Sequence, residues 1–214
     1  KKLIPDYVSK KIIEQNPNYN YIFLDFEEGK QIVKNEIHDT RLKTEIIYAI
    51  DNMPRYCHKS DVLRYVLLYI YGGCYLDVDL DMLISFDEYK NIDFLAAKGD
   101  TDMGNGLLIA KKNSQILLDL ILFSIKNKNL FNPEPKYRGE NIHYLFNYLK
   151  NKCENNNLTF ESCNRFTINN EIIYLLKGEN DSKYGVNCFK DNNKVVMTPN
   201  NPLYNFKRQT SSYI

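Results

Sequence analysis

Apolar residues recur along this chain with two spacings, one typical of helices and one typical of strands. Apolar positions three and four residues apart predict helices over residues 10–15, 27–37, 40–53, 60–71, 114–126 and 139–152. Runs rich in β-branched, aromatic and aliphatic residues predict strands at residues 21–25, 74–79, 92–99, 106–111, 171–176, 184–189 and 194–199. Helices and strands alternate in the first part and strands dominate the end, which favours an α/β fold with a mixed sheet.

The helix predicted before the Gly72-Gly73 pair has clear boundary signals. Ser60 is a suitable N-cap, and Asp61 would lie in the first turn, where a carboxylate interacts favourably with the helix dipole. The two glycines end the helix in the usual C-terminal manner. Its apolar positions indicate that at least one face is packed, and they are Val62, Leu63, Val66, Leu67 and Ile70.

Three aspartates alternate with apolar residues directly after the glycines, in the stretch YLDVDLD. Because strand side chains alternate between faces, Asp77 and Asp79 are expected on one face; we expect the strand to end near Asp79 and Asp81 to turn outward. Carboxylates so close repel one another, and a divalent cation would remove that cost. A solvated acidic edge strand and a metal site both explain the pattern. The position at the end of a probable central strand favours the metal site.

Asp61 and Arg64 are three residues apart and therefore share a helix face. They form either a surface ion pair of little energetic consequence or a ligand-binding pair in which Asp61 holds the guanidinium toward phosphate or hydroxyl groups. Other chemistries lack their motifs: the sequence has no phosphate-binding glycine loop and no recognisable nucleophile triad. Two carboxylates on one strand also do not flank a scissile bond as in a glycosidase.

The composition narrows the class of protein. The chain has 214 residues, so we expect residues 1–214 to form a single domain. Its formal net charge of +1 gives no footprint for nucleic acid, and no apolar run is long enough for a transmembrane segment. The five cysteines are scattered; a Cys153–Cys163 bridge is one interpretation, and free thiols are favoured. Localisation stays open between cytoplasm and secretory-pathway lumen.

The ordered combination S-D-x-x-R, then G-G-x-Y-x-D-x-D, resembles the sugar-binding region with the DXD motif of glycosyltransferase family 32. That family includes the fungal Golgi initiating mannosyltransferases and is related to the large clostridial glucosylating toxins. The resemblance is densest over residues 60–86 and weaker over residues 17–126. It implies a GT-A type fold, in which helices flank a mixed central sheet. It also implies a metal-dependent retaining transferase that moves a sugar from a nucleotide-sugar, a UDP- or GDP-sugar, to a glycan, protein or lipid acceptor.

The resemblance assigns roles to particular residues. Asp79 would bind Mn²⁺ or Mg²⁺ directly, and Asp77 would bind the metal through water and contact the ribose or sugar hydroxyls. Asp61 and Arg64 would hold the donor sugar and its phosphate side. Two further residues would complete the site, with Tyr75 lining the nucleoside pocket and the catalytic Asn105 near the transferred sugar.

Two departures from the family pattern are visible. Relatives begin with a strand that helps to bind the base, and we expect this chain to begin after it. Relatives also tend to close the site with a C-terminal Ser-Trp, whereas this chain contains no tryptophan. Its last residues offer a substitute, with the hydroxyls of Ser211 and Ser212 toward the phosphate or metal and Tyr213 stacked on the donor. These departures support an alternative function, a catalytically weak or inactive sugar-nucleotide or glycan-binding module. A metal-dependent phosphohydrolase is a third, less favoured interpretation.

Overall fold

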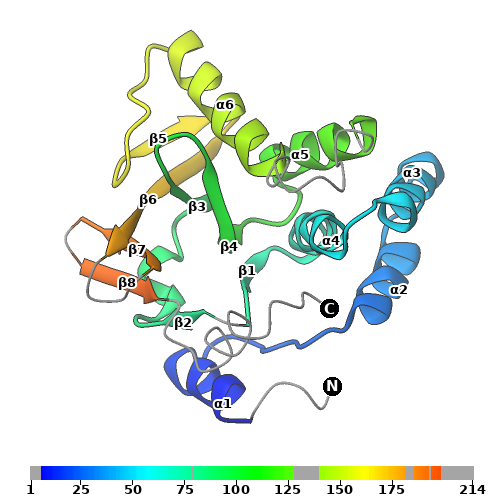
Figure 1. Ribbon diagram of the computed structural model, residues 1–214, viewed down its shortest axis with the longest axis horizontal. Coiled ribbons are helices and arrows are strands. Elements are labelled where there is room, and N and C mark those ends of the chain that lie inside the picture. Colours follow the sequence, from blue (N-terminus) through cyan, green and yellow to red (C-terminus); the bar gives the residue numbers. More distant parts are fainter. Residues whose placement is uncertain (1–5, 79, 128–139, 182–185, 193, 199–214) are drawn as a thin grey trace.

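The computed structural model describes residues 6–78, 80–127, 140–181, 186–192 and 194–198. These residues form a mixed sheet with helices packed against it, and Figure 1 shows α2, α3, α4 and α5 gathered on one side of the strands. The prediction of an α/β fold with a mixed central sheet flanked by helices is confirmed.

Four of the six predicted helices begin within one residue of the predicted start, whereas α1 and α4 each begin four residues earlier than predicted. Asp25 and Glu28 form a capping box, and the side chains of Asp39 and Ser114 each accept a hydrogen bond from a backbone N–H of the following helix. The helices are α1 (Asp6–Gln15), α2 (Phe26–Glu36), α3 (Thr40–Asn52), α4 (Tyr56–Tyr71), the 3-10 helix η1 (Phe86–Tyr89), α5 (Gln115–Lys126) and α6 (Glu140–Asn155).

The strands form one sheet in the order β1-β4-β3-β6-β7-β8-β2, and β5 pairs with β6 beside this path. β3 and β6 run parallel, whereas the other described pairs run antiparallel. The strands are β1 (Gly73–Leu76), β2 (Asp81–Met82), β3 (Phe94–Lys98), β4 (Met103–Ala110), β5 (Arg165–Ile168), β6 (Glu171–Asp181), β7 (Val186–Asp191) and β8 (Lys194–Thr198).

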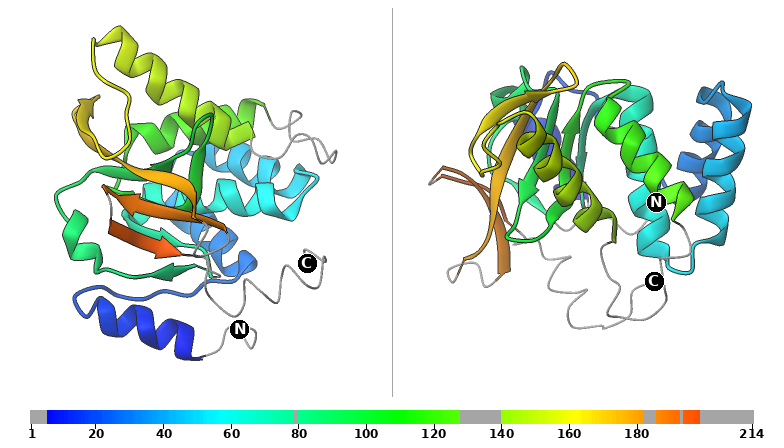
Figure 2. Two further views of the ribbon diagram at one scale, coloured as in Figure 1. Left: turned by 60° about the vertical axis from the view of Figure 1, so that its left-hand side comes forward. Right: turned by 90° about the horizontal axis from the view of Figure 1, so that it is seen from above.

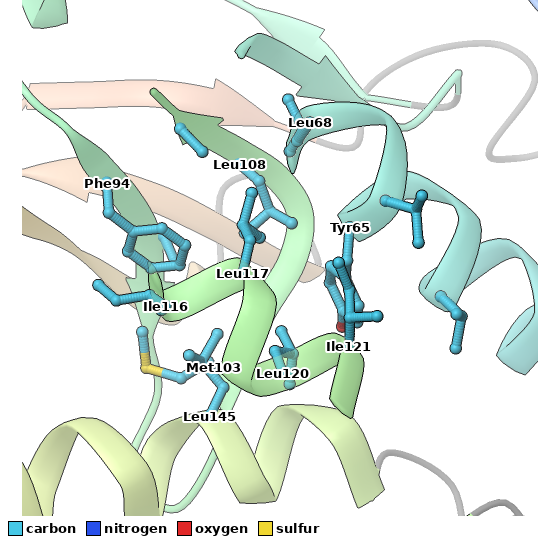
Figure 3. Packing of buried hydrophobic residues seen from close by; sticks show 14 of the residues in the cluster. Tyr65, Leu68, Phe94, Met103, Leu108, Ile116, Leu117, Leu120, Ile121 and Leu145 are labelled. Atoms are coloured by element: carbon cyan, nitrogen blue, oxygen red, sulfur yellow. The ribbon is translucent and has the colours of Figure 1, made fainter. Parts of the chain in front are cut away.

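Both faces of the central strands are covered, so the protein has two apolar clusters. Phe94 and Ala96 of β3 belong to the cluster beneath the helices, and Leu95 and Ala97 belong to the cluster on the opposite face. The alternation follows from the two-residue period of a strand. Figure 3 shows the helix-side cluster, in which side chains of α4, α5 and α6 pack against β3 and β4. On the other face, Phe86 and Tyr89 of η1 belong to the second cluster. The right-hand view of Figure 2 shows the helices α2 to α5 together on one side of the strands.

The strand predicted at residues 21–25 is wrong. These residues follow an extended path but pair with no strand in the part of the chain that the structure describes. Tyr21 and Ile22 are 38% and 64% exposed. Their side chains have high strand propensity, but propensity alone does not supply a pairing partner.

The start predicted for the helix before the glycines is also wrong. α4 begins at Tyr56, one turn before Ser60, so Ser60 is not a cap and Asp61 does not lie in the first turn. The extra turn is stabilised by the ring of Tyr56, whose centroid lies 4.9 Å from that of Phe26 on α2. The end at Gly72 is confirmed: this residue caps the helix with a φ of 68°, which favours glycine.

The strand after the glycines is shorter than predicted, because β1 ends at Leu76. Asp77 extends the pairing with one hydrogen bond, from its N–H to the carbonyl of Gly106 at 2.8 Å, and the chain then turns, with Leu80 N–H donating to the Asp77 carbonyl. Asp81 was expected to turn outward. Instead it begins β2, opposite Thr198 of β8, and its carboxylate lies 3.3 Å from the amine of Lys11.

Several smaller features complete the description. β2, β5 and η1 are too short for the periodic signals used above, and the sequence predicted none of them. Cys57, Cys74, Cys153 and Cys163 are free thiols, as favoured, and the side chain of Cys188 lies outside the described part. In the residues that the structure describes, no helix is both long and apolar enough to cross a membrane.

Glu171, the first residue of β6, connects this strand to the N-terminus of α5 through hydrogen bonds. Its carboxylate is 1% exposed and accepts hydrogen bonds from the Ser114 hydroxyl at 2.7 Å and from the Gln115 N–H. We expect Glu171→Ala to lower the free energy of unfolding by about 2–3 kcal/mol, because the buried Ser114 hydroxyl and the partly buried Gln115 N–H lose their acceptor. Urea unfolding measures this loss. The matched control Glu154→Ala removes an exposed glutamate, and an equal effect in both variants would contradict the prediction.

Candidate active site

Five of the residues singled out from the sequence come together at one end of the sheet. Asp61 and Arg64 lie on α4, Tyr75 lies on β1, Asp77 directly follows β1, and Asn105 lies on β4. The antiparallel pairing of β1 with β4 places Leu76 opposite Leu107, which brings Asp77 beside the Asn105 region. α4 leads into β1 through the Gly72-Gly73 pair, and its Asp61 and Arg64 face Asp77 and Asn105.

Arg64 is the centre of this cluster, and its side chain is only 7% exposed. Its Nη2 lies 3.0 Å from Asp61 Oδ1, and its Nη1 lies 3.3 Å from Asp77 Oδ1. Nη1 also donates to the backbone carbonyl of Asn105 at 2.8 Å. The guanidinium lies over the ring of Tyr75, 4.4 Å from its centroid. A planar fork with several donors is suited to hold these groups at once, whereas an ammonium is not. The interpretation of a surface ion pair is therefore wrong, since Arg64 is buried.

The two carboxylate oxygens of Asp77 differ in their contacts with the described residues. The Tyr75 hydroxyl donates to Oδ1 at 2.6 Å, the same oxygen that contacts Arg64. For Oδ2, no hydrogen bond is found within the described part of the chain, and the side chain is 35% exposed. Gly106 leaves room for this carboxylate: a Cβ there would lie 3.0 Å from Asp77 Oδ2 and 2.7 Å from a methyl carbon of Leu80.

Burial controls the protonation of the cluster. Removal from water and, to a smaller extent, the nearby Asp77 raise the pKa of the Asp61 carboxyl to about 6, although Arg64 and the hydrogen bond from the Asn105 amide act to lower it. Burial by itself lowers the pKa of Arg64, but the neighbouring Tyr75, Asp77 and Asp61 raise it more, so the guanidinium stays charged. Two carboxyl groups share one guanidinium, and such an arrangement suits a ligand that brings cations or hydroxyl donors.

A cleft of about 600 Å³ adjoins the cluster. Ser60, Arg64, Tyr75 and Asp77 supply polar groups to its lining, and the extended residues 19–26, the end of α1 and apolar side chains of α4 supply much of the rest. Its volume lies in the range of small-molecule sites, which are mostly apolar with a few placed polar groups. The segment predicted to be a strand at residues 21–25 therefore forms a wall of the cleft.

Other predicted residues lie outside the described part of the chain, namely Asp79, Ser211, Ser212 and Tyr213. The described part, which omits Asp79, contains no cluster of three His, Cys, Asp or Glu side chains arranged for a metal ion. The roles of these four residues stay predictions. The described chain does end close to the motif, because Thr198 at the end of β8 pairs with Asp81.

Tyr65 belongs to the cluster, although sequence reasoning did not single it out. Its side chain is completely buried, and its hydroxyl accepts a hydrogen bond from Asn105 Nδ2 at 3.2 Å. The only signal in the sequence is its position next to Arg64 in a helix of apolar residues, where a tyrosine resembles any other core residue. Its contact with Asn105, forty residues later, depends on how the helix packs on the sheet.

Similarity to known proteins extends over part of the chain. Residues 6–95 match the family described as glycosyltransferase sugar-binding region containing DXD motif. A stretch of 71 residues is 30% identical to inositol phosphoceramide mannosyltransferase 3 of Schizosaccharomyces pombe, covering 33% of this chain and 18% of that protein. A solved structure, PaToxG Glycosyltransferase, is similar with a TM-score of 0.47 and 18% identity, covering 68% of this chain and 62% of that one. The similarity in sequence is thus to the DXD-containing sugar-binding region of glycosyltransferases, and the family match is confined to residues 6–95, less than half of the chain.

Proposed function

We propose that this protein is a metal-dependent retaining glycosyltransferase that uses a UDP- or GDP-sugar. The observation that carries the proposal is the buried Arg64, which lines the cleft of about 600 Å³ and joins Asp61, Asp77 and Asn105. A buried, preorganised guanidinium beside a ligand-sized cleft is suited to a charged leaving group such as a nucleoside diphosphate.

In this proposal each residue of the cluster has a role. Arg64 faces the phosphate side of the donor, and Asp61 holds its guanidinium and contacts the donor sugar. Tyr75 lines the nucleoside pocket while its hydroxyl orients Asp77. The reaction breaks the bond between the anomeric carbon and the β-phosphate oxygen and forms a bond to an acceptor hydroxyl on the same face. The acceptor proton passes to the departing β-phosphate, so no base and no covalent enzyme intermediate are required.

The residues present suit a bound Mn²⁺ or Mg²⁺. Asp77 offers Oδ2, a hard oxygen with no partner among the described residues, and Asp79 is the second ligand that the DXD pattern assigns. When bound, the cation supplies positive charge that stabilises the β-phosphate as the nucleoside diphosphate leaves. We further propose that Ser211, Ser212 and Tyr213 close over the donor, which the exit of the chain beside Asp81 favours.

The test is the release of free nucleoside diphosphate from a panel of UDP- and GDP-sugars, with Mn²⁺ and then with EDTA. We expect cation-dependent release from one sugar nucleotide, lost in an Asp77→Asn/Asp79→Asn double variant and kept in Asp81→Asn. Long incubations are needed, because hydrolysis without an acceptor is slow. Release that continues in EDTA would contradict metal dependence. Cation-dependent binding of one donor without any release, also after acceptor glycans, proteins and lipids are added, would favour the alternative of a sugar-nucleotide-binding module.

A further inference from the structure

The side-chain amide of Asn105 is held by two partners. Its Nδ2 lies 3.0 Å from Asp61 Oδ1 and 3.2 Å from the Tyr65 hydroxyl. The backbone of the same residue is held separately, because its carbonyl accepts a hydrogen bond from Arg64 Nη1. Both the main chain and the side chain of Asn105 are therefore anchored to α4.

These partners determine which atom of the amide is available to a ligand. An ionised carboxylate only accepts hydrogen bonds, so the nitrogen of Asn105, and not its oxygen, must face Asp61. The Tyr65 hydroxyl takes the second N–H. Both donors of the amide are then used within the protein, and the carboxamide oxygen is left as an acceptor on a half-buried residue whose partner Arg64 lines the cleft.

Tyr65 is a rigid support for this arrangement. Its side chain is completely buried, and Figure 3 shows it between α4 and α5, beside Ile121 and Leu120 of the core. A tyrosine ring that is packed on all sides keeps its hydroxyl in one place, since protein interiors are close-packed. The position of the Asn105 amide is thus defined by the packing of α4 against the sheet and α5.

We propose that Tyr65 is a positioning residue. Its hydroxyl, together with Asp61, orients Asn105 so that the carboxamide oxygen accepts a hydrogen bond from a hydroxyl of the sugar that is transferred. The inference rests on the proposed function, because it names a contact to the sugar part of the donor. In this proposal Asn105 contacts a hydroxyl of the sugar, whereas Arg64, Asp77 and Tyr75 contact the nucleoside diphosphate.

The first experiment measures how Tyr65→Phe changes the affinity for a sugar nucleotide and the affinity for the matching nucleoside diphosphate. The substitution removes one oxygen atom and keeps the packing of the ring. Isothermal titration with Mn²⁺ uses UDP-glucose against UDP and GDP-mannose against GDP. We expect affinity for the bound sugar nucleotide to fall by about 3- to 10-fold, the size of one hydrogen bond, with affinity for the nucleoside diphosphate unchanged. Tyr69→Phe, one turn further along the same helix, is the matched control and should change neither. Equal loss for both ligands, or no loss at all, would overturn the proposal.

A second measurement does not need a ligand. In ¹⁵N NMR spectra, the side-chain amide of Asn105, identified by its disappearance in Asn105→Asp, should show hydrogen exchange slower than that of exposed asparagines. Exchange should become faster in Tyr65→Phe and stay slow in Tyr69→Phe. Fast exchange in the wild-type protein would overturn the orientation of Asn105. Failure of every sugar nucleotide to bind the wild-type protein would instead overturn the proposed function, and with it the sugar hydroxyl as the ligand of Asn105.

Discussion

Arg64→Lys is expected to lower the rate of cation-dependent sugar transfer or donor hydrolysis by about 10²-fold or more, the usual effect of removing a preorganised donor from an active site. The guanidinium contacts Asp61, Asp77 and the Asn105 carbonyl at once, and it lies over the ring of Tyr75. An ammonium is a point charge and cannot reproduce this planar fork. The substitution keeps the charge, so the effect measures geometry.

The matched control for this variant is Arg41→Lys. Arg41 is exposed on α3 and pairs with Glu45 one turn away, a contact that contributes little to stability. Steady-state rates of the two variants should be compared after their urea midpoints have been measured, so that each assay contains folded protein. Near-normal turnover in a folded Arg64→Lys variant would contradict the proposed role of Arg64 in the active site.

Asp79→Asn is expected to abolish cation-dependent donor binding while leaving the melting temperature nearly unchanged. A neutral carboxamide is a much weaker ligand for Mn²⁺ or Mg²⁺ than a carboxylate. Removal of one charge next to Asp77 also relieves repulsion between carboxylates in the protein without metal. Thermal unfolding with and without Mn²⁺ and the donor measures both parts of the prediction.

Asp81→Asn is the matched control, because it changes the third aspartate of the same run. Asp81 forms an ion pair with Lys11 and lies in β2, so the Asp81→Asn variant should keep cation-dependent binding of the donor. Full cation-dependent activity in Asp79→Asn would contradict the assignment of Asp79 as a metal ligand. Equal loss in both variants would show that the acidic run acts only through its total charge.

Much of the fold could be predicted from local patterns. α2, α3 and α5 have caps and apolar spacing that agree with each other, and the structure places them within one or two residues of the prediction. β3, β4, β6 and β8 were likewise predicted from their apolar runs; in the structure β3, β4 and β6 contribute to both clusters, and β8 contributes Val196 and Met197 to the second. Consistent local signals of this kind specify an element whatever its neighbours are.

The errors fall where an element depends on a partner distant in sequence. Residues 21–25 have strand propensity, but no described strand pairs with them and they line the cleft. The first turn of α4 is supported by Tyr56 against Phe26, thirty residues earlier. The short β2 exists only because β8 lies beside it. In each case tertiary contacts override or replace local preference.

The sequence by itself determined which side chains the site can use: the ordered Asp61, Arg64, Tyr75 and Asp77 motif lies in residues 6–95, which are similar to the DXD-containing sugar-binding region of glycosyltransferases. Only the tertiary structure decided that Arg64 is buried and that Asn105 joins it from β4, since this contact depends on the pairing of β1 with β4 and on the packing of α4. Only the tertiary structure likewise brought Tyr65 to Asn105. Helical spacing records that a residue is buried, but it does not record which polar atom its hydroxyl meets.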